Sequence, residues 1–147
     1  MDRTLPSCSQ YDSDITIKFS RFSAGCRDNF RLPTYFFTVV SSGERVGEVI
    51  FRNSQKSIVA EVGHIGFYID ESHRGNNLAY EATLQILPFI RLNQFRFILI
   101  VCSPSNIATQ RIAARLGAQF SGEHLHHAGS EMYALGYRKY WQYVLHI

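Results

Sequence analysis

The spacing of apolar residues changes abruptly at about residue 76. Before this point, apolar residues alternate with polar ones at residues 15–19 and gather in aromatic and β-branched runs at residues 34–40 and 45–52. Both patterns are typical of β-strands. After it, apolar residues recur every three or four positions over residues 78–90, which predicts an amphipathic helix. A chain that changes period in this way folds as an α/β domain.

The remaining patterns complete a single domain. Further strands are expected at residues 61–69, 95–102, 119–127 and 137–146, and a second helix at residues 106–116. The expected order is four strands, a helix, a strand, a helix and two strands, which builds a central mixed β-sheet flanked by helices. The 147 residues match one domain, in which residues 1–13 are polar and expected to be loose.

Several local features refine these elements. Pro88 is expected to bend the first helix, and Gly117 to end the second. Gly63 and Gly66 fall inside the strand expected at residues 61–69, where a glycine indicates a bulge or a close backbone approach. Turns are expected at residues 41–44 and 53–57, and a longer connection at residues 23–33. The nearly continuous apolar run at residues 95–102 predicts a central strand covered on both faces.

Composition narrows the class of protein. Hydrophobic residues make up 46% and charged residues 18%, which excludes a disordered or low-complexity chain. The net charge of +3 suits an anionic ligand and is too weak to support nucleic-acid binding. Cys8, Cys26 and Cys102 have no paired spacing, which argues against a disulfide framework or a cysteine zinc site. No run has signal-peptide or membrane-span length, so we expect a cytoplasmic protein without membrane attachment.

The segment at residues 68–79 (YIDESHRGNNLA) has the character of a phosphate-binding loop. A strand is followed by a short polar loop and then by a helix that begins on small residues. At such a helix start, the free backbone N–H groups and the helix dipole both favour a bound anion. Gly75 and Ala79 would let a phosphate approach the main chain, Asn77 tolerates left-handed geometry, and Arg74 adds charge. The alternative is an ordinary strand-to-helix turn with a surface arginine.

Two motifs in this region resemble a known superfamily. Residues 74–79 (RGNNLA) resemble the acetyl-CoA pyrophosphate loop of the GNAT N-acetyltransferases, whose pattern is Arg/Gln-x-x-Gly-x-Gly/Ala, with Asn77 in place of the middle glycine. Residues 106–109 (NIAT) and 115–118 (RLGA) are similar to that family's Asn-x-x-Ser/Ala and Lys-Leu-Gly-Phe segments. In the family, the motif asparagine contacts the pantetheine arm of the cofactor. The resemblance extends over about residues 35–145.

This resemblance implies a fold and a cofactor, acetyl-CoA, as acyl donor. The strands at residues 61–69 and 95–102 would be parallel neighbours that splay apart, with Gly66 at a bulge, and the pantetheine would pair with the exposed edge of the first. The residues expected to bind the cofactor are Phe67, Tyr68, Ile69, Arg74, Gly75, Asn76, Asn77, Leu78, Ala79, Asn106 and Thr109.

Glu61 is the best candidate for the base that deprotonates an amine. Arg74 follows it by 13 residues, the interval found in the histone-acetyltransferase branch of the family. A carboxylate in the sheet interior suits this role, and the alternative is a surface glutamate at a strand start. His64 is a second candidate, because an imidazole titrates near neutral pH, and its alternative is a hydrogen-bonded core histidine.

The acid that protonates the leaving thiolate is less clear, because the family's usual tyrosine position holds Ala113. Substitutes are Tyr133, Tyr137, Tyr140 and Tyr143, of which we take Tyr140 as the catalytic candidate. Aromatic packing is the alternative for each, and the thiolate can also take its proton from water.

Two further groups contain residue types that bind metals or act as nucleophiles. His124, His126 and His127 form a histidine-rich tract of the kind that binds zinc. With no acid or cysteine expected beside them, we interpret them as an exposed or pocket-rim cluster and expect no metal site. Cys102 is expected to line the acetyl pocket without acting as a nucleophile.

Residues 23–33 are too few for the two helices that usually wall the acceptor side in this family. The acceptor site is therefore open, or a second copy of the chain supplies the wall as a homodimer. We expect direct acetyl transfer in a ternary complex to a primary amine: a small amine, a peptide N-terminus or a lysine. The alternative is a catalytically weak acyl-CoA-binding regulatory module, which Asn77 and Ala113 favour.

Overall fold

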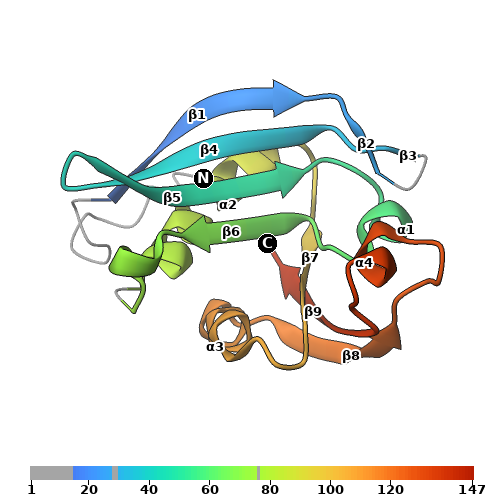
Figure 1. The fold of residues 1–147 in the computed structure, drawn as a ribbon. Coiled ribbons are helices and arrows are strands. Elements are labelled where there is room, and N and C mark those ends of the chain that lie inside the picture. Colours follow the sequence, from blue (N-terminus) through green and yellow to red (C-terminus); the bar gives the residue numbers. More distant parts are fainter. Residues whose placement is uncertain (1–14, 28–29, 76) are drawn as a thin grey trace.

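The computed structural model describes residues 15–27, 30–75 and 77–147. Its first part is a four-stranded antiparallel sheet (Figure 1). In spatial order, the strands are β1 (Ile15–Ser23), β4 (Thr34–Ser41), β5 (Glu44–Arg52) and β6 (Ile65–Ile69). Two short strands, β2 (Cys26–Arg27) and β3 (Phe30–Arg31), pair with each other between β1 and β4.

The second part is a three-stranded antiparallel sheet. Its strands are β7 (Phe97–Cys102), β9 (Lys139–His146) and β8 (Gln119–Leu125), with β9 in the middle. Two long helices, α2 (Leu78–Leu92) and α3 (Ile107–Leu116), accompany the sheets, and α2 lies behind the four-stranded sheet in Figure 1. Three single turns complete the fold: α1 (Lys56–Val59), the 3₁₀ turn η2 (Glu71–His73) and α4 (Glu131–Ala134).

The expected order of the main elements is confirmed, as is a single α/β domain with helices flanking the strands. The strand ladders of the described chain are all antiparallel and form two main sheets and the separate β2–β3 pair, rather than one mixed sheet. The two sheets approach each other along β6 and β7, which share no ladder. The expectation that residues 1–13 are loose lies outside the described residues.

The main core lies between the four-stranded sheet, α2 and β7. Helix α2 buries the face predicted from its period, including Leu78, Ala82, Ile86 and Ile90, and it continues through Pro88 to Leu92. Strand β7 is covered on both faces as expected. Ile98 and Ile100 join the main core, whereas Leu99 packs on the other face with Leu32 and Val59.

The spacing of Ala108, Ile112 and Leu116 predicts an apolar stripe on the second helix, and this prediction is partly wrong. Thr109 and Ala113 are the buried residues of α3, with Ile112 and Leu116 half-buried, whereas Ala108 is exposed. Gly117 ends this helix in the left-handed conformation, as expected.

The strand expected at residues 61–69 is shorter than predicted and begins at Ile65. Helix α1 occupies part of the segment expected as a turn, and residues 60–62 form a turn after it. Gly63 then adopts φ +83°, a left-handed conformation that cannot continue a strand. Glu61 therefore lies in a turn before the strand, not on it.

The two glycines of this segment have different roles. A Cβ at Gly63 would lie 2.9 Å from the carbonyl oxygen of Leu99, so the close backbone approach expected for this glycine is confirmed. The bulge expected at Gly66 is absent, because Gly66 pairs in regular register with Ile50 and the β5–β6 ladder is continuous.

The connection between β1 and β4 contains the β2–β3 pair and no helix among its described residues, which leaves out residues 28 and 29. The expectation that two helices do not fit here agrees with what the structure describes. Elsewhere, α4 was not predicted, and each of the last two strands is two residues shorter than expected.

We predict that Gly63→Ala destabilises the fold more than Gly43→Ala. Both glycines have positive φ, +83° and +78°, so both substitutions cost about 1–2 kcal/mol in left-handed strain. Only at Gly63 does the new Cβ also press on Leu99, which adds about 1–3 kcal/mol. Denaturant unfolding of both variants measures the difference, and equal losses would contradict a close contact between the two sheets at Gly63.

Candidate active site

A cavity of about 580 Å³ lies between the end of β6, the loop that follows it, and α3. The residues predicted to bind the cofactor line it, except Asn76, which is outside the described residues. Its full lining comprises Phe67, Tyr68, Ile69, His73, Arg74, Gly75, Asn77, Leu78, Ala79, Tyr80, Asn106, Ala108, Thr109, Arg111, Ile112 and Arg115. We call it the cofactor cavity.

The end of β6 forms one wall of the cofactor cavity. Its residues pair with β5 along one edge, and the opposite edge has no partner strand in the described chain. The backbone of Phe67 to Ile69 is thus free to pair with an extended ligand. Arg74 is tied to this wall, because its Nε donates to the carbonyl oxygen of Ile69 at 2.9 Å.

The start of α2 has a backbone conformation that suits anion binding. Gly75 has φ +88° and Asn77 has φ +60°, so Asn77 adopts the left-handed conformation foreseen for it. The Asn77 side chain makes no cap hydrogen bond here, and the first N–H groups of a helix have no acceptor within the backbone of the helix itself. Unpaired N–H groups at a helix start attract phosphate.

Sequence reasoning missed the basic side of this cavity. Arg111 and Arg115 of α3 lie one helical turn apart and line it opposite the loop that carries Arg74. The Arg115 guanidinium lies 4.0 Å from the centre of the Tyr80 ring, a cation–π contact between the two helices. The four-residue spacing of these two arginines was the available signal. Three guanidinium groups suit a ligand with several phosphates.

Asn106 lies where the cofactor cavity meets a second cavity, because it lines both. Its Oδ1 accepts a hydrogen bond from the Thr109 N–H at 3.1 Å, so it is the N-cap of α3. Its Nδ2 has no hydrogen-bond partner among the described residues. Asn106 therefore serves the helix with one atom and keeps a donor for a ligand with the other.

The second cavity has a volume of about 370 Å³ and holds the catalytic candidates Glu61 and Tyr140. We call it the catalytic cavity. Its lining residues are Arg52, Glu61, Val62, Val101, Ser103, Asn106, His126, Met132, Tyr137 and Tyr140.

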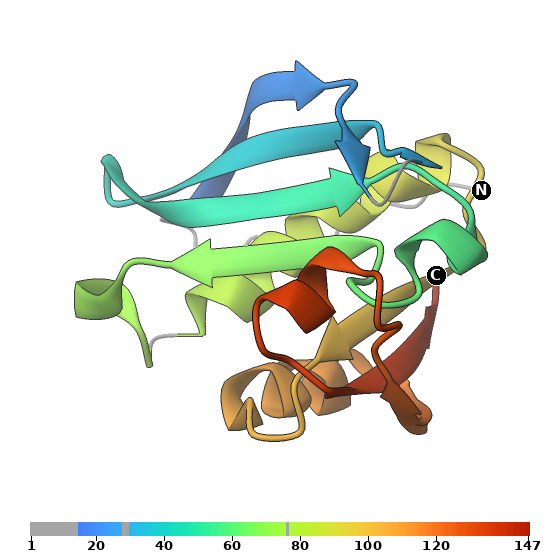
Figure 2. The same cartoon turned by 45° about the vertical axis from the view of Figure 1, so that its right-hand side comes forward.

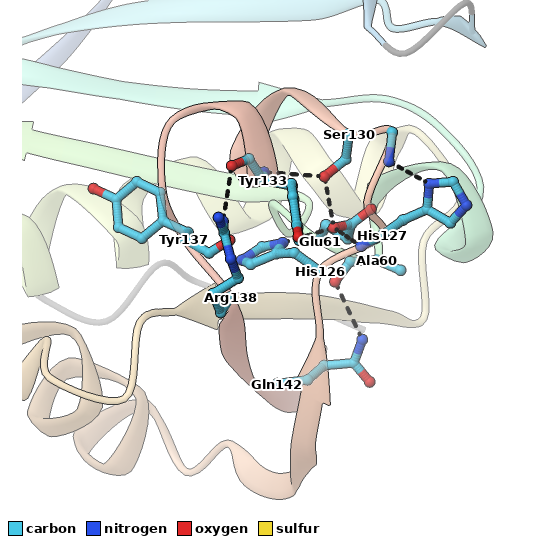
Figure 3. Close-up of polar contacts among 10 residues, drawn as sticks. Ala60, Glu61, His126, His127, Ser130, Tyr133, Tyr137, Arg138 and Gln142 are labelled. Atoms are coloured by element: carbon cyan, nitrogen blue, oxygen red, sulfur yellow. Dashed lines mark hydrogen bonds and ion pairs between the residues drawn. The ribbon is translucent and has the colours of Figure 1, made fainter.

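The carboxylate of Glu61 is held by three donors (Figure 3). Its Oε1 accepts hydrogen bonds from His126 Nδ1 at 2.6 Å, the His127 N–H at 3.0 Å and Ser130 Oγ at 3.1 Å. The donors come from the segment that leads into α4, which Figure 2 shows in red beside the three-stranded sheet. Oε2 has no partner in the described part of the chain. The sequence alternative of a free surface glutamate is therefore wrong.

The contact between Glu61 and His126 corrects our interpretation of the histidine tract. His126 was expected to be exposed or at a pocket rim without an acid partner. Its side chain is 2% exposed and bonded to Glu61. It also lies beyond the end of β8 rather than on that strand. Residues 61 and 126 are far apart in sequence, and no local pattern relates them.

Of the four candidate tyrosines, Tyr140 and Tyr137 line the catalytic cavity. Burial raises the pKa of Tyr140, and the negative charge of Glu61 raises it further. The phenol of Tyr140 thus remains a proton donor at neutral pH. Tyr143 is part of the main core, as is Cys102, which lines neither cavity.

His64 does not line the catalytic cavity and is fully engaged in the core. Its Nδ1 accepts from the Leu99 N–H at 2.9 Å, and its Nε2 therefore carries the proton and donates to the Ser54 carbonyl oxygen at 3.1 Å. Burial lowers the pKa of His64 to about 4, the charge of Arg52 adds to this, and the Ser54 hydrogen bond opposes it. His64 is therefore the hydrogen-bonded core histidine of the alternative interpretation, and it is not placed to act as a base.

Comparison with known proteins relates this arrangement to one family. The model of the acetyltransferase (GNAT) domain matches residues 8–119. No curated protein sequence matches the chain. Within the described residues, no helix is long and apolar enough to cross a membrane.

Solved structures show the same fold at low sequence identity. One is the ribosomal L7/L12 α-N-protein acetyltransferase RimL in complex with coenzyme A, with TM-score 0.60, 19% identity, and coverage of 78% of this chain and 62% of that one. Another is the microcin C7 self-immunity acetyltransferase MccE in complex with acetyl-CoA and AMP, with TM-score 0.58, 16% identity, and coverages of 78% and 61%. A third is a putative ribosomal-protein-serine acetyltransferase from Vibrio cholerae, with TM-score 0.56, 23% identity, and coverages of 78% and 64%. The chain thus spans less than two thirds of each of these structures.

We predict that His64 makes the fold sensitive to acid. Its pKa is about 4 in the folded chain and 6.5 in the reference state, so below pH 6.5 the unfolded chain binds a proton that the folded chain does not. Stability therefore falls between pH 6.5 and 4, by on the order of 3 kcal/mol. The variant His64→Gln lacks the imidazole, so its stability should not show this pH-dependent loss. Urea unfolding of both proteins from pH 7 to 4 compares the slopes, and parallel slopes would exclude His64 as their cause.

Proposed function

Because the chain belongs to the GNAT acetyltransferase family, we propose that it transfers an acetyl group from acetyl-CoA to a primary amine by direct attack in a ternary complex. The observation that carries this proposal is the meeting of two cavities at Asn106. One is lined by arginines and the start of α2, and the other contains Glu61. A phosphate-rich acyl donor and a group that promotes proton removal are thereby brought side by side.

The cofactor cavity supports acetyl-CoA as the donor in three ways. The start of α2, with Arg74, Arg111 and Arg115, receives the phosphates. The unpaired edge of β6 receives the amide groups of the pantetheine arm as a neighbouring strand would. The Nδ2 of Asn106 donates to the same arm where the two cavities meet. We also propose that Asn76 contacts the cofactor. This assignment rests only on the resemblance of residues 74–79 to the pyrophosphate loop of the family.

The catalytic cavity supports proton removal and proton return. We propose that Glu61 drives the removal of a proton from the acceptor amine, because it is the carboxylate of this cavity. The amine nitrogen then attacks the thioester carbon, and the C–S bond breaks as the thiolate leaves. We assign Tyr140 as the donor that protonates the thiolate, since its raised pKa keeps the phenol protonated.

The acceptor is proposed to be the N-terminus of a protein. Two of the similar structures are named as acetyltransferases of ribosomal proteins, one of them acting on an α-amino group. The short β1–β4 connection, without a helix in its described part, suits a bulky acceptor. We propose that this side stays open or is covered by a second copy of the chain. A small amine and a lysine side chain are the other acceptors to test.

We predict that Gly75→Glu abolishes acetyl-CoA binding. The change places a carboxylate beside the proposed phosphate site. Acetyl-CoA should raise the melting temperature of the native protein and leave that of the variant unchanged. Gly43→Glu is the matched control, because Gly43 has a similar positive φ and equally open surroundings but lies in the β4–β5 turn. Its thermal shift should remain.

The same proteins test turnover. Release of free thiol from acetyl-CoA is measured with a small primary amine, a peptide with a free N-terminus, and an N-terminally blocked peptide that contains lysine. The native protein and Gly43→Glu should release thiol, and Gly75→Glu should not. A thermal shift without thiol release for any acceptor would refute the transferase and identify the alternative, an acyl-CoA-binding regulatory module.

We predict that Asn106→Asp separates the two roles of Asn106. Aspartate keeps the oxygen that caps α3, so thermal stability should be retained. It removes the Nδ2 donor, which should weaken coenzyme A binding by about 1–2 kcal/mol. Calorimetric titration with coenzyme A measures this loss. Unchanged affinity would limit Asn106 to its capping role.

A further inference from the structure

We propose that His126 is the catalytic base that takes the proton from the acceptor amine, and that Glu61 is the positioning residue that orients and charges it. This inference rests on the proposed function and refines it, because Glu61 then drives proton removal through the imidazole. It stands on the geometry of the catalytic cavity.

The hydrogen bond between His126 and Glu61 fixes the tautomer of the imidazole. His126 Nδ1 lies 2.6 Å from Glu61 Oε1, and an ionised carboxylate can only accept a hydrogen bond. Nδ1 therefore carries the hydrogen, and in the neutral ring the lone pair resides on Nε2. A carboxylate that holds the tautomer of a basic histidine is the arrangement found in hydrolase triads.

The lone pair of Nε2 is available in the catalytic cavity. His126 lines this cavity although its side chain is 2% exposed. Nε2 has no hydrogen-bond partner among the described residues, and it is not a fully enclosed atom. The ring is held in place by Tyr140 and Tyr137, whose centroids lie 4.8 Å and 6.4 Å from its own. The buried ring thus keeps one nitrogen without a partner among the described residues, in a cavity that Asn106 also lines.

Glu61 is bound in a way that suits a positioning residue. Three donors converge on its Oε1, so the carboxylate is fixed in one orientation. When Nε2 gains a proton, the imidazolium forms directly beside this negative charge and is stabilised by it. The other charged or titratable groups of the cavity are Arg52, Tyr137 and Tyr140, and His124 stacks on Tyr140.

The proposed step balances in protons and bonds. An ammonium acceptor gives one proton to Nε2 of His126 and becomes a neutral amine. Its nitrogen forms the C–N bond with the thioester carbon, and the tetrahedral intermediate expels the thiolate as the C–S bond breaks. The thiolate takes a proton from Tyr140, which recovers one from the attacking nitrogen. The imidazolium finally releases its proton to solvent, so one proton leaves in each cycle.

The first experiment replaces the base and keeps its contact with Glu61. In His126→Asn, the amide can still donate to Oε1 but has no basic nitrogen in the cavity. We expect kcat/KM for the acceptor that the native protein uses fastest to fall about 10²–10⁴-fold. The thermal shift with acetyl-CoA should persist, because the cofactor cavity is intact. His124→Asn is the matched control, because His124 also contacts Tyr140 but does not line the catalytic cavity, and its turnover should equal the native value.

The second experiment uses the pH dependence of kcat/KM in Glu61→Gln. The glutamine oxygen still accepts from Nδ1 but no longer stabilises the imidazolium by charge. If His126 is the base, the rate falls, and the ascending limb of the profile persists and moves to lower pH. If Glu61 itself is the base, the limb that belongs to it disappears. This measurement decides the question alone if His126→Asn does not fold.

The outcomes separate this inference from the proposed function. If the native protein releases no thiol from acetyl-CoA with any acceptor, the proposed function fails. If the native protein is active and His126→Asn, folded and able to bind acetyl-CoA, retains near-native turnover, the function stands and His126 is not the base. Loss of the ascending limb in Glu61→Gln also overturns the assignment.

Discussion

Hydrogen bonds of one residue, His64, link the two sheets of this protein where β6 and β7 approach each other. Its main-chain N–H donates to the Leu99 carbonyl oxygen, and its ring accepts from the Leu99 N–H and donates to Ser54. Its own carbonyl oxygen accepts from the Arg52 N–H, at the end of β5. Strands β6 and β7 share no ladder in the described chain, so beyond this joint nothing pairs with the free edge of β6. The opening that the cofactor cavity needs thus follows from a structural histidine, whose neutral form is essential because both ring nitrogens are used in opposite senses.

The same short turn also carries the proposed chemistry. Glu61 lies three residues before His64, and Gly63 lets the chain reverse between them by adopting a left-handed conformation against Leu99. The close approach that fixes the sheets therefore fixes the carboxylate as well. That carboxylate in turn accepts hydrogen bonds from His126, His127 and Ser130, which lie in a segment with little regular secondary structure. The fold and the catalytic cavity depend on one anchored turn, so a change in the packing of Gly63 is expected to affect both.

Positive charge is concentrated at one cavity of this molecule, although the net charge of the chain is small. The net charge of +3 suits an anionic ligand but does not show where it would bind, whereas Arg74, Arg111 and Arg115 line one cavity together with the start of α2. Two of these arginines come from α3, which also supplies Asn106, where the cofactor and catalytic cavities meet. Helix α3 thus connects the proposed phosphate site with the proposed reaction centre. Its N-cap asparagine has one polar atom for the helix and another for a ligand.

By itself, the sequence determined the order of the main strands and helices, the buried face of α2 and the left-handed Asn77, and it led to the proposal of a cofactor loop. Each of these depends on neighbours within a few positions, where apolar period and the preferences of glycine and asparagine act directly. Only the tertiary structure decided that Glu61 lies in a turn, that His64 is a joint, and that His126 meets Glu61 across 65 residues of chain. Contacts of that kind form when separate elements pack together, and no local pattern encodes which distant side chain will complete a buried polar group.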